Sequence, residues 1–98
     1  MEKYQSRTVD ELGRVVIPFD FRKKLGLKAG DSISLTHTST EVTMQRAEGN
    51  TEPNRALCQV DELGRVGLPA NIRQQMGWKE RAKIAMHHND NVIILKSA

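Results

Sequence analysis

Short stretches of alternating hydrophobic and polar residues predict that the chain is built mainly of β-strands, each with one buried face. Residues 14–18 follow this pattern, because Val15 and Ile17 fall on one face of an extended chain. Val66 and Leu68 occupy the same places in a later stretch. We expect this face to line the core. The alternation also predicts two strand hairpins, formed by residues 32–38 with 41–46 and by residues 83–88 with 91–96.

Two short helices are predicted between these strands. Pro18 and Pro69 suit the first turn of a helix, where a missing N–H group is harmless. Gly26 and Gly77 suit the left-handed residue that ends a helix. Apolar residues four positions apart share one side of a helix, and we expect that side to face the core. In the two helices these residues are Phe21 with Leu25, and Ile72 with Met76.

The segments Asp10–Gly13 and Asp61–Gly64 are typical of tight turns. An aspartate side chain can accept hydrogen bonds from the backbone that follows it, and glycine readily adopts a positive φ. We therefore expect the strands on either side of each turn to pair as a hairpin. Adjacent carboxylates in a turn usually diverge into solvent, so Asp10 and Glu11 are not expected to be catalytic.

The chain contains one small unit twice. Val9–Lys28 and Val60–Lys79, separated by 51 positions, are identical at 11 of 20 residues. Each unit is close to the length, roughly 40 residues, below which a chain alone buries too little surface to fold. The units are therefore expected to share one core. We predict one barrel over residues 1–98, made of repeat 1 (residues 4–47), a linker (residues 48–54) and repeat 2 (residues 55–98).

The charge and hydropathy of the chain indicate which kinds of partner it can bind. The chain has 15 Lys/Arg and 12 Asp/Glu, a formal net charge of +3, and both halves share the excess. A nucleic-acid site must therefore come from the placement of a few arginines and not from bulk charge. No apolar stretch has the length of a signal peptide or a membrane span. We expect a cytoplasmic protein that does not associate with a membrane.

Little in the sequence suggests chemistry other than binding. The single cysteine, Cys58, allows no internal disulfide, and no histidines or cysteines have the spacing of a zinc cluster. His87 and His88 are adjacent in a predicted strand and so point to opposite faces. Neither a phosphate-binding glycine loop nor a nucleophile with a base at a known spacing is present. We expect no enzyme activity, metal, cofactor or small-molecule substrate.

The residues from Val9 to Leu27, Val-Asp-Glu-Leu-Gly-Arg-Val-Val-Ile-Pro followed by Phe-Asp-Phe-Arg-Lys-Lys-Leu-Gly-Leu, closely resemble the DNA-binding domain of the AbrB/SpoVT/MazE family. In that family two short repeats, usually from two chains, exchange hairpins to form one β-barrel, and members are bacterial regulators and antitoxins. The resemblance implies a swapped-hairpin β-barrel of two tandem β-β-α-β-β repeats, a pseudo-dimer within one chain. It also implies a transcription regulator that binds double-stranded DNA at the nucleoid.

The resemblance also assigns DNA-contacting cations, which lie before the first turn, just after its glycine and on the outer helix face. In this sequence they are Arg7, Arg14, Arg22, Lys23, Arg65 and Arg73. Cys58 and Gln74 stand in the second repeat where Arg7 and Lys23 stand in the first. We therefore expect an asymmetric DNA face to which the first repeat contributes more.

Other interpretations stay open. Arg14 and Arg65 could simply pair with the nearby acids, and residues 22–24 could be an ordinary solvated helix face. An antitoxin-like protein would bind mainly a toxin, although the chain ends at Ala98 without the extended tail expected of such proteins. A protein-docking module is another alternative, because fold alone does not fix function. The sequence also does not say whether two chains pair further.

Overall fold

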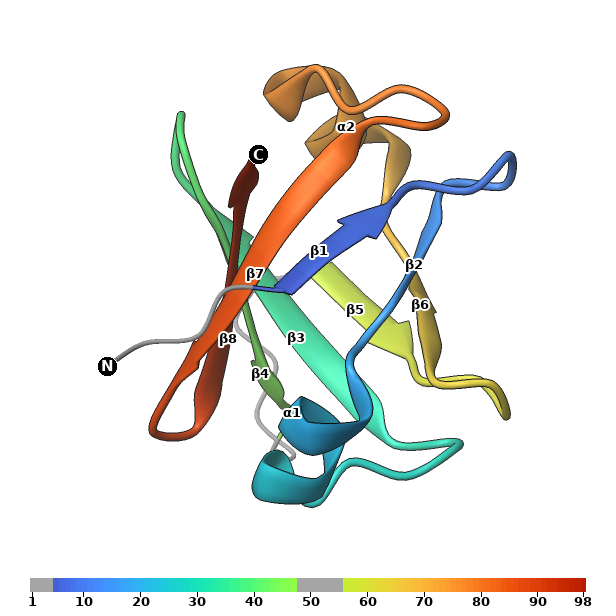
Figure 1. Cartoon of the computed structure of the whole chain (residues 1–98), viewed down its shortest axis with the longest axis vertical. Helices are drawn as coiled ribbons and strands as arrows, with labels where there is room; N and C mark the ends of the chain where they lie inside the picture. The colour runs from blue at the N-terminus through green and yellow to red at the C-terminus, as the bar shows by residue number, and fades with distance from the viewer. Residues whose placement is uncertain (1–4, 48–55) are drawn as a thin grey trace.

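The computed structural model describes residues 5–47 and 56–98, which form eight β-strands and two short helices (Figure 1). The first half contains β1 (Gln5–Thr8), β2 (Arg14–Val16), α1 (Phe19–Leu25), β3 (Ser32–His37) and β4 (Val42–Arg46). The second half has the same order: β5 (Ala56–Gln59), β6 (Arg65–Gly67), α2 (Ala70–Met76), β7 (Lys83–Asn89) and β8 (Val92–Ser97). The predicted mainly β fold with short helices is confirmed. The predicted linker, residues 48–54, lies outside the described residues.

Strands of the two halves pair with each other in both sheets. One sheet has six strands in the order β1-β7-β8-β4-β3-β5, and the other consists of β2 and β6. The hairpins β3–β4 and β7–β8 form as predicted. The other four antiparallel pairs each join one half to the other: β1–β7, β3–β5, β4–β8 and β2–β6. Neither half therefore has a complete sheet of its own.

The predicted pairing of β1 with β2 is wrong. These strands do not form a hairpin across Asp10–Gly13, nor do β5 and β6 across the equivalent turn. The chain changes sheets at the turn, because Val9 N–H donates to Ala82 O at 3.0 Å and Ile17 N–H donates to Gly64 O at 2.9 Å. The strands on either side of the turn thus extend different ladders. Among the described residues the two sheets enclose the core without a ladder between them, so closure of the predicted barrel is not detected.

The core lies between the two sheets and draws on both halves. Its predicted face on β2 and β6 is confirmed, since Val15 and Val66 are almost completely buried. Phe21 and Ile72 are the buried residues of the two helices, whereas the apolar residues four positions on are only partly buried. Trp78 is also buried, and its Nε1 donates to Ser97 Oγ at 2.9 Å. The only tryptophan therefore fills the core with its polar group satisfied.

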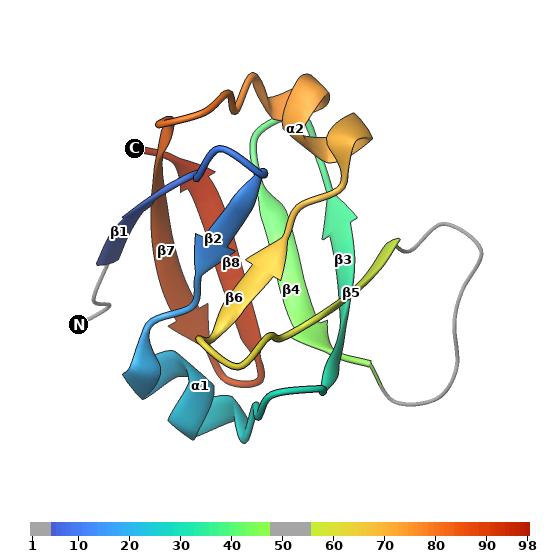
Figure 2. The ribbon, with the colours of Figure 1, turned by 90° about the vertical axis from the view of Figure 1, so that its right-hand side faces the viewer.

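The helices lie beyond opposite ends of the β2–β6 ribbon (Figure 2). Pro18 directly precedes α1, and Gly26 ends it with a left-handed φ of 67°. Pro69 and Gly77 do the same for α2, as predicted. Each helix has seven residues, and none in the described part of the chain combines the length and apolarity needed to cross a membrane. Because each helix directly follows a ribbon strand, its first turn is held beside the ribbon.

Candidate nucleic-acid interface

The outer face of the β2–β6 ribbon carries two of the predicted arginines. Val15 pairs with Val66 at the centre of the ribbon, and both side chains point into the core. Since side chains alternate along a strand, their neighbours point outward. Arg14 lies opposite Gly67, and Val16 lies opposite Arg65. The two arginines therefore stand at opposite ends of the ribbon, related by a pseudo-twofold axis through its centre.

The tight turns hold Arg14 and Arg65 in place. Asp10 Oδ1 accepts the backbone N–H groups of Leu12 and Arg14, at 2.9 and 2.8 Å, and its Oδ2 accepts Arg14 Nε at 2.8 Å. Asp61 makes the same three bonds in the second turn, including one from Arg65 Nε at 2.7 Å. The backbone N–H of Arg14, with smaller contributions from its guanidinium and from Leu12, lowers the pKa of Asp10.

These ion pairs orient the arginines and leave them accessible. The side chains of Arg14 and Arg65 are 31% and 27% exposed, and the bonds to Asp10 and Asp61 engage Nε. Arg14 and Arg65 therefore do pair with the nearby acids, the alternative that the sequence left open for them. Pairing through Nε is compatible with DNA contact, because a guanidinium has five N–H donors.

Arg22 and Arg73 lie over the turns of the opposite halves. Arg22 Nε donates to Ile17 O at 3.0 Å, and Arg73 Nε donates to Leu68 O at 3.0 Å. A Cβ atom added at Gly64 would lie 2.5 Å from Arg22 Cζ, which shows how closely this guanidinium covers the turn. An added Cβ at Gly13 would lie 2.6 Å from Arg73 Cζ.

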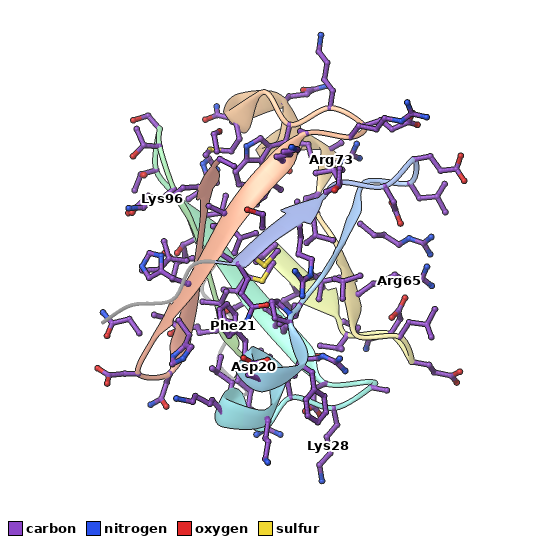
Figure 3. All side chains as sticks on the ribbon, viewed as in Figure 1. Asp20, Phe21, Lys28, Arg65, Arg73 and Lys96 are labelled. Carbon is purple, nitrogen blue, oxygen red and sulfur yellow. The ribbon has the colours of Figure 1, made fainter. Side chains whose placement is uncertain are left out.

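Each end of the ribbon therefore combines an arginine from one half with an arginine from the other. We define the Arg65 end by Arg65, Arg22 and Val16, and the Arg14 end by Arg14, Arg73 and Gly67. α1 adjoins the Arg65 end and α2 adjoins the Arg14 end (Figure 2). Figure 3 shows Arg65 beside the ribbon and Arg73 below α2. The structure thus brings four of the six predicted cations to one side of the molecule.

Arg7 and Lys23, the other two, differ from these four. Arg7 lies on β1, where its Nη1 donates to Ser6 O at 2.8 Å and its Nη2 donates to Gln5 Oε1 at 3.3 Å. These bonds hold it along its own strand, which is at one edge of the six-stranded sheet. Lys23 is exposed on α1, one residue after Arg22. It can add positive charge beside the Arg65 end.

The side chains and the hollow that surround these arginines were not predicted from the sequence. Phe19 is 67% exposed, and its ring centroid lies 5.5 Å from Arg22 Cζ, a cation–π distance. Ala70 takes the place of Phe19 beside Arg73, and an open hollow of about 450 Å³ lies there. Its lining consists of Ala70, Arg73, Gln74, Gly77, Trp78 and Lys79. The replacement of Phe19 in the first repeat by Ala70 in the second could have indicated this difference from the sequence alone.

Groups that could support other chemistry are sparse. Burial raises the pKa of the Cys58 thiol to about 11, so the thiol is protonated at neutral pH, in line with the half-buried strand residue predicted. His88 packs its ring edge-on against Phe21, with 5.0 Å between the centroids. Among residues 5–47 and 56–98, no three His, Cys, Asp or Glu side chains are grouped as a metal site would require.

The β2–β6 ribbon carries the arginines and lies between the two short helices. Because strands of the two halves pair with each other, the protein is a small swapped-hairpin β-protein. Residues 6–48 match the family described as "Antidote-toxin recognition MazE, bacterial antitoxin". The first half of the chain is therefore similar to the AbrB/MazE-like swapped-hairpin proteins.

A solved structure is similar over most of the chain. It is described as the solution structure of PHS018 from Pyrococcus horikoshii, with a TM-score of 0.54 at 24% sequence identity. The match covers 97% of this chain and 87% of that one, and it shows a shared fold. No curated protein matches the chain significantly.

Proposed function

We propose that this protein is a bacterial DNA-binding transcription regulator of the AbrB-like type. The observation that carries the proposal is the grouping of Arg14, Arg22, Arg65 and Arg73 on the ribbon side of the molecule. Arginine suits this task because its planar fork binds phosphates and the guanine O6/N7 edge with two hydrogen bonds. As a regulator it would act in the cytoplasm, on the nucleoid, with no metal, cofactor or catalytic step.

The two-stranded form of the ribbon supports this function. A two-stranded antiparallel ribbon fits the major groove of B-DNA, which is about 12 Å wide. In such a pose Arg14 and Arg65 face the base edges, while Arg22, Arg73 and Lys23 approach phosphates on either side. Fixed turn bonds restrain Arg14 and Arg65 before DNA arrives, which reduces the entropy lost on binding.

A second candidate function is the binding of a protein partner such as a toxin. It is favoured by the family description and by the exposed apolar residues at the turn tips, since Leu12 and Leu63 are each 66% exposed. Apolar surface of this kind can mark a protein interface. Toxin binding and DNA binding can also occur in one protein on different surfaces.

Fluorescence anisotropy with a labelled generic duplex, measured over a range of salt concentrations, tests the proposal. With about five cations engaged, log affinity should fall with log salt at a slope of roughly −4.5. Arg22→Ala should weaken binding more than Arg73→Ala, because Arg22 on α1 is followed by Lys23 and Lys24, whereas Arg73 on α2 is followed by Gln74 and Gln75. Arg14→Ala should also weaken binding more than Arg73→Ala, because Arg14 faces the base edges in this pose. Lys96→Ala is the matched control, because it removes a positive charge from β8, which Figure 3 shows on the opposite side of the molecule from Arg65.

Two results would count against DNA binding. One is the absence of a salt-sensitive complex at low ionic strength. The other is affinity that all three arginine changes leave intact. Either would favour a protein-docking role for the same face.

A further inference from the structure

The two ends of the ribbon have the same number of arginines but different exposed apolar side chains. Arg65 faces Val16 across the ribbon, and Val16 is 36% exposed. Arg14 faces Gly67, which has no side chain. Phe19 adds exposed apolar surface next to Arg22, and that end alone has it among the described residues of the ribbon and its flanking helices. The turns add one exposed leucine to each end, Leu12 to the Arg14 end and Leu63 to the Arg65 end, so Val16 and Phe19 are the apolar side chains by which the two ends differ.

Base edges in the major groove offer one apolar group that such a surface can recognise. This group is the C5 methyl of thymine, whereas arginine preferentially binds guanine. Cross-strand neighbours in an antiparallel pair have Cβ atoms about 4.5–5.5 Å apart. That separation is comparable to one to two base-pair steps of about 3.4 Å, so Arg65 and Val16 can meet neighbouring base pairs.

We propose that Val16 is a specificity-determining residue that reads a thymine methyl beside the guanine bound by Arg65. This inference rests on the DNA-binding function proposed above. The Arg14 end has no counterpart of Val16 and reads its half of the site without that thymine. The recognised sequence is therefore non-palindromic, although the two arginine pairs are placed symmetrically.

The positive charge of the flanking helices also differs between the two ends of the ribbon. Lys23 and Lys24 follow Arg22 on α1, whereas Gln74 and Gln75 follow Arg73 on α2. The Arg65 end thus combines the apolar contact with the larger positive charge. The charge strengthens binding to phosphates of any sequence, so the apolar contact is what distinguishes one half-site from the other.

The experiment is a selection of bound duplexes from random DNA, carried out in parallel with the full-length wild type, Val16→Gly and Gly67→Val. The wild type should yield a site with thymine beside the guanine in one half only. Val16→Gly should lose that thymine, and Gly67→Val should gain it in the other half. Gly67→Val requires little rearrangement, because a Cβ added at Gly67 would lie 3.9 Å from Arg14 Cγ, an ordinary van der Waals distance. Val16→Ser provides a second loss variant with a smaller change in backbone freedom.

A second experiment removes a single methyl group from the selected duplex. Replacing the thymine by deoxyuridine removes only the C5 methyl and should weaken wild-type binding about fourfold, the factor expected for burying one methyl-sized group. The same replacement should leave the affinity of Val16→Gly and Val16→Ser unchanged.

The outcomes separate this inference from the proposed function. If the wild type selects a palindrome, or if deoxyuridine weakens wild type and both Val16 variants equally, the role of Val16 is overturned while DNA binding stands. If the wild type binds no duplex at low salt, the proposed function fails and the inference falls with it.

Discussion

Replacing Gly64 with alanine should damage the protein in two separable ways. Gly64 has a φ of 79°, a left-handed conformation that costs a residue with a Cβ roughly 1–2 kcal/mol. The new Cβ would also lie 2.5 Å from Arg22 Cζ, so the guanidinium must move. The move breaks its bond to Ile17 O, and a hydrogen bond contributes about 0.5–1.5 kcal/mol net. We expect the free energy of unfolding to fall by about 1.5–3.5 kcal/mol, the sum of these terms.

Gly77→Ala is the matched control for backbone strain. Gly77 also has a left-handed φ, 71°, but no atom lies within 4 Å of its added Cβ. It should therefore lose only the strain energy, about 1–2 kcal/mol. In an Arg22→Ala background, Gly64→Ala should cost about as much as Gly77→Ala, because no guanidinium has to move.

Urea unfolding followed by the fluorescence of the buried Trp78 measures these differences. DNA affinity at low salt provides the second measurement, and Gly64→Ala should weaken binding as much as Arg22→Ala does. The reasoning is refuted if Gly64→Ala and Gly77→Ala have equal costs in the wild-type background. It is also refuted if Gly64→Ala unfolds more easily yet binds DNA as well as the wild type.

Three further predictions follow from the core, the turns and the cysteine. Phe21→Ala should lower the free energy of unfolding by about 3–5 kcal/mol in urea titrations, because Phe21 is 1% exposed; a loss below 1 kcal/mol would contradict this. Folding lowers the pKa of Asp10 and of Asp61 below the ordinary 3.8, so their stabilisation is present above that pH and lost as pH falls through the lowered values. Acid titration of Asp10→Asn/Asp61→Asn should therefore show a flatter loss of stability below about pH 4 than the wild type, and identical profiles would exclude this role. Cys58 should react slowly with a thiol reagent at pH 8 and rapidly once urea unfolds the chain, because burial raises its pKa to about 11; equal rates would show an accessible thiol.

Local features of this chain could be predicted from its sequence because their causes are local. The burial of Val15 follows from strand alternation, and the end of α1 at Gly26 follows from the left-handed φ that glycine permits. The bonds from Asp10 to the backbone of its own turn also follow from neighbouring residues alone. Each of these features depends on a few consecutive positions.

The errors concern contacts between distant residues. The Asp10–Gly13 turn was correctly predicted, yet a turn does not specify whether its flanking strands pair with each other. Here β2 pairs with β6, so Arg14 lies opposite Gly67, a residue of the other half. The contact of Arg22 with Gly64 could not be derived from spacing either, because it exists only after the halves exchange strands.

Strand exchange also changes what asymmetry between the repeats means. The sequence predicts that the first repeat contributes more to DNA binding, but each end of the ribbon contains arginines from both halves. Val16 and Arg22 come from the first half and act beside Arg65 of the second. The useful comparison is therefore between the Arg65 end and the Arg14 end.

Joining two units in one chain allows these ends to diverge. In a swapped dimer of identical chains, any change at one end of the ribbon must appear at the other, which restricts recognition to palindromic sites. In a single chain, position 16 can hold valine while its counterpart, position 67, holds glycine. Phe19 and Ala70 differ in the same way. In the proposed complex, the symmetrically placed arginines would hold the duplex at both ends of the ribbon, and the residues that differ between the ends would set the direction of binding.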